Sequence, residues 1–130
     1  MRSLAICSSN KFAEEVIEFA EKLKKMGVHV YLPHYYTYHH GGLEKINGHD
    51  KRFIAMGLTH DHFHKIRLAD VIFVYNKNGY VGPSTTLEIG FATALGKPVY
   101  ALESDATEVC RDILFKETIK NPKELVKKLK

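Results

Sequence analysis

Short apolar runs alternate with amphipathic helical patterns along the chain. The apolar runs cover residues 4–7, 28–32, 71–75 and 99–102. Nearly continuous apolar runs of this length are typical of strands that are buried on both faces of a parallel sheet. Because strands that alternate with helices form such sheets, the pattern predicts an α/β fold.

The helical patterns have recognisable beginnings and ends. The first has an apolar stripe and a glycine stop, formed by Phe12, Val16, Phe19, Ala20, Leu23 and Gly27. Another predicts a helix over residues 85–95, which Gly96-Lys97-Pro98 ends. The chain then predicts a fifth strand over residues 112–119 and a closing helix from Asn121, its N-cap, onward.

These elements predict a three-layer, flavodoxin- or Rossmann-like sandwich with a central, mainly parallel five-stranded sheet. No repeat or linker interrupts the 130 residues, so we expect a single domain over residues 1–130. Residues 33–50, PHYYTYHHGGLEKINGHD, break the rhythm, and a connection this long is usually functional or mobile. Its tyrosines, Tyr35, Tyr36 and Tyr38, either stack on a planar base or pack onto the edge of the sheet.

Composition and charge narrow the function classes. The 45% hydrophobic and 26% charged residues are those of an ordinary globular protein, and no apolar run approaches the ~20 residues of a membrane span. Two cysteines form no disulfide framework, and no signal peptide is recognisable, so we expect a cytoplasmic location. The net charge of +4 comes largely with lysines on the outer faces of helices, which favours a solvated surface over a nucleic-acid partner.

Three segments are expected to surround one crevice, because ligands of open parallel sheets bind beyond the carboxyl ends of the strands. These segments are residues 7–10, 33–40 and 76–88. Ser8, Ser9 and Asn10 follow the first strand and open a helix, where free N–H groups favour an anion such as phosphate. Capping of the helix by Ser9 or Asn10 is the simpler alternative.

Glu88 has two interpretations. The spacing from Thr85 to Glu88 fits a capping box, in which the glutamate binds the N–H of the cap residue. The same position near a helix N-terminus keeps a carboxylate ionised, as a nucleophile that attacks an anomeric carbon must be. In the second interpretation, Gly79 and Gly82 let the backbone approach a sugar closely, and the hydroxyl groups of Ser84, Thr85 and Thr86 are donors.

The histidines raise the question of a metal. His60 and His64 are four residues apart and can share one helix face, as paired ligands do. No cysteine is near them in the sequence, and the HExxH pattern is absent. We therefore expect surface or pocket-lining histidines, with no metal and no cofactor.

The segment from Leu68 to Glu103 resembles the nucleoside 2-deoxyribosyltransferase superfamily, which includes deoxynucleoside 5′-monophosphate N-glycosidases. The shared features are Ala69-Asp70 before a strand, the loop 82–86, the helix start 88–92 (EIGFA) and Gly96-Lys97-Pro98. Cys7-Ser8-Ser9 is also similar to the first phosphate or sugar loop of the monophosphate glycosidases.

The resemblance implies cleavage of the N-glycosidic bond of a nucleoside or nucleoside 5′-monophosphate, by hydrolysis or by base transfer, with Glu88 as nucleophile. Two positions depart from the family. Gly82 stands where transferases have aspartate and glycosidases tend to have serine, and His62, with Asp61 beside it, stands where the family has aspartate. His62 is then a candidate proton donor to the departing base.

The candidate residues follow from both lines of argument. Glu88, His62 and Asp61 are the candidate catalytic residues. The candidate substrate-binding residues are Cys7, Ser8, Ser9, Asn10, Tyr35, Tyr36, Asp70, Asn76, Gly79, Gly82, Ser84 and Thr85. The expected partner is a small nucleoside or nucleotide, without nucleic acid polymer or membrane, and the resemblance implies a homodimer or higher homo-oligomer. The alternative function is a non-catalytic nucleotide-binding or sensing module on the same fold.

Overall fold

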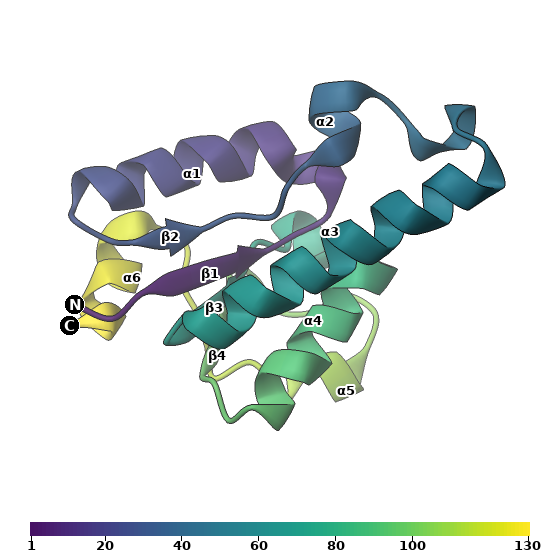
Figure 1. Ribbon diagram of the computed structural model, residues 1–130. Helices are drawn as coiled ribbons and strands as arrows, with labels where there is room; N and C mark the ends of the chain where they lie inside the picture. The colour runs from purple at the N-terminus through teal and green to yellow at the C-terminus, as the bar shows by residue number, and fades with distance from the viewer.

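The computed structural model describes all residues, 1–130, and contains one five-stranded parallel sheet (Figure 1). The strand order is β2-β1-β3-β4-β5. The strands are β1 Leu4–Cys7, β2 Val30–Tyr31, β3 Val71–Val74, β4 Val99–Ala101 and β5 Glu117–Thr118. Every neighbouring pair is parallel, and this is the strand order of flavodoxin-like sheets.

Helices cover both faces of the sheet, which makes three layers. The helices are α1 Ala13–Lys25, α2 Tyr36–His40, α3 Gly48–Leu68, α4 Pro83–Ala94, α5 Val109–Asp112 and α6 Pro122–Leu129. One apolar core lies between the sheet and α1 and α6, and a second lies between the sheet and α3 and α4. Alternate residues of β1 supply them: Leu4 and Ile6 face the first core, whereas Ala5 and Cys7 face the second. The predicted three-layer α/β fold is confirmed.

The short helices α2 and α5 are not predicted by the sequence, β5 covers only the end of the stretch expected to be a strand, and α4 and α3 begin elsewhere than expected. α4 begins at Pro83 rather than Thr85, because proline suits the first turn of a helix and Gly82 is the N-cap. α3 starts within the segment expected to be a long connection, with Asn47 as its N-cap. Its first turns extend past the sheet and are largely exposed (Figure 1). Because these turns do not pack on a core, their sequence has no apolar stripe that would predict a helix. No helix has both the length and the apolar composition needed to cross a membrane.

Asn76 joins the loops that follow β3 and β4. Its side chain is fully buried, its Nδ2 donates to the carbonyl of Glu103 at 2.7 Å, and its Oδ1 accepts from the Glu103 N–H at 2.9 Å. Gly79 follows with a φ of +73°, and a Cβ there would lie 2.7 Å from the Cβ of Ala106. These contacts fix the loop from which α4 starts.

Replacing Asn76 tests this loop anchor. Asn76→Ala is expected to lower the free energy of unfolding by roughly 1–3 kcal/mol, because it leaves the partly buried N–H and C=O of Glu103 without these partners. Urea unfolding measures the change. The control is Asn78→Gly, at a residue with φ of 61°, where relief of backbone strain and the freer unfolded chain offset each other. Equal destabilisation by both variants would contradict the anchor.

Candidate active site

A cavity of about 220 Å³ lies at the carboxyl edge of the sheet. It is lined by the segments after β1 and β2, by α3 and by the start of α4, namely Ser8, Ser9, Asn10, Pro33, His34, Tyr36, Thr37, Leu43, Leu58, Thr59, His62, Tyr80, Gly82, Pro83, Ser84, Thr85 and Glu88. The chain leaves the neighbouring strands β1 and β3 in opposite directions here. The connection after β1 runs to β2 on one side, and the connection after β3 runs to β4 on the other. Such a switch point is where parallel α/β sheets bind ligands.

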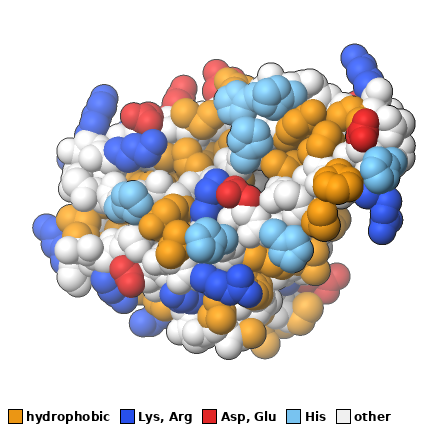
Figure 2. All heavy atoms as spheres, viewed as in Figure 1, with side chains coloured by type: hydrophobic (Ala, Val, Ile, Leu, Met, Phe, Trp, Pro, Cys, Tyr) orange, Lys and Arg blue, Asp and Glu red, His pale blue; other side chains and the backbone are white.

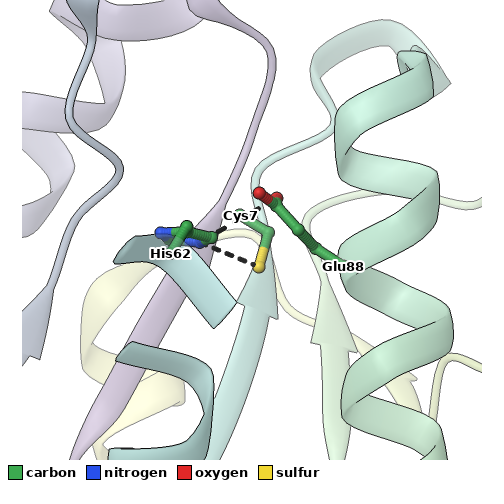
Figure 3. Close-up of side chains that lie close together, drawn as sticks. All are labelled: Cys7, His62 and Glu88. Carbon is green, nitrogen blue, oxygen red and sulfur yellow. Dashed lines mark hydrogen bonds and ion pairs between the residues drawn. The ribbon is translucent and has the colours of Figure 1, made fainter. Parts of the chain in front are cut away.

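Three side chains from distant parts of the sequence meet at the base of this cavity (Figure 3). The Sγ atom of Cys7 lies 3.4 Å from Nε2 of His62, and the same nitrogen lies 3.9 Å from Oε1 of Glu88. The sulfur, the nitrogen and the carboxylate oxygen all lie within 4.8 Å of one another. Cys7 belongs to β1, His62 to α3 and Glu88 to α4, so the tertiary fold assembles the group.

Local structure explains why each side chain points inward. Cys7 is the last residue of β1 and pairs in register with Val74, on the face that α3 and α4 cover. His62 lies four residues before Ile66, and both are buried where α3 packs on the sheet. Glu88 precedes the buried Ile89 in α4 and keeps one side toward the cavity.

The capping-box interpretation of Glu88 is wrong. The N-cap of α4 is Gly82, so Glu88 is the sixth helical residue, and the first turn contains no acidic residue. The stabilisation of an anion by a helix N-terminus fades beyond the first turn. Burial therefore dominates and raises the pKa of Glu88 to about 8, opposed only by the Cys7 thiol. The helix end does not keep this carboxyl group ionised in the free protein.

The other two members of the group are also uncharged near neutral pH. Burial, reinforced by the positive charge of Lys65, lowers the pKa of His62 to about 4. Burial and the neighbouring Glu88 raise the pKa of the Cys7 thiol well above its usual value. The atom Nδ1 of His62 is buried without a hydrogen-bond partner. The site thus holds three titratable groups whose charged forms are all disfavoured by burial.

Side chains from the segment after β2 hold the loop that follows β1. The hydroxyl groups of Ser8 and the buried Tyr35 are 2.6 Å apart, so Tyr35 supports this loop instead of lining the cavity. Ser9 accepts from the N–H of Lys11 and caps a short 3₁₀ turn. Asn10 donates to Thr37 at 3.5 Å, which links the loop to α2.

The segment after β2 places aromatic rings at the rim. Tyr36 lines the cavity, whereas Tyr38 is exposed and does not. His34, His39 and His40 gather beside them, with ring centroids about 6 Å apart, and Figure 2 shows this group of histidines over α2.

Six of the candidate residues are not among the cavity-lining residues, namely Cys7 and Tyr35, described above, and four others. Asp61 is exposed and pairs with Lys65 at 2.7 Å. Asp70 lies at the opposite, amino end of β3, where it accepts from the N–H of Ser3 at 2.8 Å. Asn76 and Gly79 build the loop described above. The structure therefore brings together Ser8, Ser9, Asn10, Tyr36, His62, Gly82, Ser84, Thr85 and Glu88 at the cavity, with Cys7 directly behind.

Several cavity residues are not among the candidates from the sequence. Leu58 and Thr59 lie four and three residues before His62, a spacing that places them on the same helix face and would have identified them. Tyr80 also lines the cavity, and the ammonium group of Lys11 lies 3.7 Å from its ring centroid. This cation–π contact holds a positive charge beside the cavity.

Comparison with known proteins assigns the family. Residues 7–126 match the family model for nucleoside 2-deoxyribosyltransferase, so the chain belongs to this family, as its motifs indicated. No curated protein sequence matches the chain.

Solved structures share the fold at low sequence identity. A 2-deoxyribosyltransferase from the psychrotolerant bacterium Bacillus psychrosaccharolyticus superposes with a TM-score of 0.65 at 16% identity, over 95% of this chain and 89% of that one. A conserved protein from Enterococcus faecalis V583 has a TM-score of 0.63 at 17% identity, over 99% and 97% of the two chains.

The burial of Glu88 predicts a pH dependence of stability. Because its pKa is raised on folding, from 4.5 to about 8, the folded state binds the proton more tightly, and wild type loses stability as pH rises through this window. Glu88→Gln cannot ionise. Its free energy of unfolding relative to wild type is therefore expected to rise by at most about 1.4 kcal/mol per pH unit between pH 5 and pH 8.

Urea unfolding at each pH measures the difference. Glu21→Gln, at an exposed position on α1, is the control and is expected to show no such trend. A constant difference between Glu88→Gln and wild type would show that the carboxyl group is not protonated by burial.

Proposed function

We propose that this chain cleaves the N-glycosidic bond of a nucleoside or nucleoside 5′-monophosphate, with Glu88 as the nucleophile. The observation that carries the proposal is the position of Glu88, which bears the only carboxyl group among the cavity-lining residues. Its helix α4 comes from the segment that matches the family motif, and the family assignment supports glycosyl transfer as the reaction type.

The proposed reaction passes through a glycosyl ester. A carboxylate oxygen of Glu88 attacks the anomeric carbon of the sugar, and the bond from that carbon to the base nitrogen breaks. The base leaves with the bonding electron pair and takes up a proton, and a glycosyl ester remains on Glu88. Water then hydrolyses the ester, or a second base accepts the sugar.

Moving one proton within the Glu88–His62 pair can both ionise the nucleophile and create the acid for the departing base. In the free protein it resides on Glu88, since burial raises the pKa of the carboxyl group and lowers that of the imidazole. Transfer over the 3.9 Å between the two groups leaves an ionised nucleophile and an imidazolium. The imidazolium is then the acid for the departing base. His62 thus replaces the aspartate that the family resemblance implies at this position.

Hydroxyl and amide groups around the cavity suit a sugar or phosphate. Ser8, Ser9 and Asn10, which follow β1, and Ser84 and Thr85 of α4 all line it. Four other candidates do not touch the substrate in this proposal. Asp61 and Asp70 stabilise contacts with Lys65 and Ser3, and Asn76 and Gly79 stabilise the loop before α4.

Gly82 leaves space beside the cavity. A Cβ at this position would lie 3.5 Å from the hydroxyl oxygen of Tyr80, which is ordinary contact, and its φ is −84°. A side chain therefore fits here, and its absence widens the cavity between Tyr80 and α4.

A non-catalytic nucleotide-binding module is the second candidate. The observation that favours it is the low charge of the buried group, since Glu88 is largely protonated at neutral pH in the free protein. In that case the same cavity binds the ligand, and Glu88 donates a hydrogen bond instead of attacking.

Base release separates the two candidates. Wild type is incubated with ribo- and deoxyribonucleosides and their 5′-monophosphates, and free base is measured by chromatography. Glu88→Gln is expected to reduce release by at least about 1,000-fold, because it removes the nucleophile. Glu21→Gln, on the distant surface of α1, is expected to release base like wild type. Silence of wild type, with ligands still raising its Tm, would support the binding module instead.

The shared proton predicts a bell-shaped pH profile. For wild type, kcat/KM is expected to be highest between pH values of about 4 and 8, where the pair carries one proton. Below this range Glu88 holds a proton while His62 is also charged, and above it no acid remains. His62→Gln is expected to have lower kcat and to lose the fall on the alkaline side, because activity then follows ionisation of Glu88 alone. An unchanged profile in His62→Gln would eliminate His62 as the acid.

A further inference from the structure

We propose that Cys7, His62 and Glu88 form a binding site for a borderline-soft divalent metal ion, with Zn²⁺ as the best-suited ion, and that occupation of this site blocks the nucleophile. The metal site stands on its own geometry, and only the blocking effect rests on the proposed function.

The donor set is that of zinc. A cysteine sulfur, a histidine nitrogen and a carboxylate oxygen are the three ligand types that proteins use for Zn²⁺. They converge here from β1, α3 and α4, and Figure 3 shows all three pointing toward one another. Cys7 is fully buried and His62 is 3% exposed, so the site excludes most competing water ligands.

The donor atoms all lie within 4.8 Å of one another, and two of their distances can be compared with those of a tetrahedral site. Zn–S bonds of about 2.3 Å and Zn–N and Zn–O bonds of about 2.0–2.2 Å separate tetrahedral ligands by roughly 3.3–3.6 Å. The distance from Cys7 Sγ to His62 Nε2 is 3.4 Å, which already fits. The distance from His62 Nε2 to Glu88 Oε1 is 3.9 Å, so a side-chain shift of well under ~1 Å closes this edge.

The fourth coordination position faces the cavity. His62 and Glu88 are cavity-lining residues, whereas Cys7 lies behind them and closes the other side. Three protein ligands with one open position are typical of zinc sites that admit water or a small molecule. An ion can therefore enter from the cavity without unfolding of the sheet.

One feature of a typical histidine ligand is missing from His62. Metal coordination by Nε2 places the imidazole proton on Nδ1, which is buried and has no hydrogen-bond partner. Histidine ligands usually direct this second N–H to a carbonyl or carboxylate, which orients the ring. His62 lacks this contact, so its ring is held by burial and by the contact with Cys7.

Metal binding and the proposed reaction require the same atoms. The nucleophilic oxygen of Glu88 and the acidic nitrogen of His62 are both ligands of the ion. A bound Zn²⁺ therefore removes nucleophile and acid together, and base release is expected to stop when the site is filled.

Cobalt substitution tests the site without any activity measurement. The full chain, stripped with EDTA and kept reduced, is titrated with Co²⁺. The expected result is saturation at one ion per chain, with the intense visible bands of tetrahedral Co²⁺ and a near-ultraviolet thiolate-to-cobalt band, both lost on addition of Zn²⁺. Failure to saturate at one ion per chain, or absence of the thiolate band, would overturn the site.

The two free cysteines provide a matched pair of variants. Cys7→Ser is expected to lose the thiolate-to-cobalt band, whereas Cys110→Ser, which changes the exposed cysteine, is expected to retain it. The reverse result would place the ion elsewhere. Because Cys7 lies in the core, Glu88→Gln provides a second variant, with the thiolate band present but binding weakened at least about tenfold. Unchanged Co²⁺ affinity in Glu88→Gln would exclude the carboxylate as a ligand.

Base release with and without Zn²⁺ separates this proposal from the proposed function. Inhibition by stoichiometric Zn²⁺ that EDTA reverses supports both. A cobalt spectrum from a chain that releases no base supports the metal site and contradicts the reaction. Base release by a chain without the spectrum does the opposite, and full activity with the metal bound contradicts the blocking effect.

Discussion

The parallel pairing of β1 with β3 determines where every other part of the site can lie. Its register aligns Cys7 with Val74, so both strands end at the same edge and their following loops flank one cavity. A slip of one residue would turn Cys7 toward the α1 side of the sheet and replace it with an aliphatic core residue. The same pairing gives α3 and α4 a common surface to pack on, and this packing brings His62 and Glu88 to the sulfur.

Burial of Cys7, His62 and Glu88 at the carboxyl edge of the sheet has a free-energy cost. A charged carboxylate or imidazolium is expensive in an apolar setting, and the site reduces this expense by keeping all three groups neutral. Burial raises the pKa of Glu88 and lowers that of His62, so the two values separate widely. Such separation within one pair is how a single proton comes to be available for transfer at neutral pH.

Sequence patterns predicted what local physics determines and missed what the tertiary structure creates. The strands at 4–7 and 71–75, the three layers and the family were accessible because buried strands and short motifs are continuous in sequence. The contact between Cys7 and His62 joins residues 55 positions apart and left no trace in spacing. Asp70 belongs to the family motif but precedes β3, so the strand's direction places it at the far edge of the sheet. The start of α4 differs from the prediction by two residues, because Pro83 and Ser84 form the beginning of its first turn.

A single residue type at position 62 accounts for the chemical character proposed for this site. With an aspartate there, as the family resemblance implies, two buried carboxyl groups would face each other, and like charges this close cannot both ionise. An imidazole instead presents a nitrogen to the sulfur of Cys7 and, in the proposed reaction, accepts the proton of Glu88. The same substitution therefore produces both an acid for the proposed reaction and a third ligand type for a metal ion. The two uses exclude each other at any moment, because each needs the unshared electron pair of the same nitrogen.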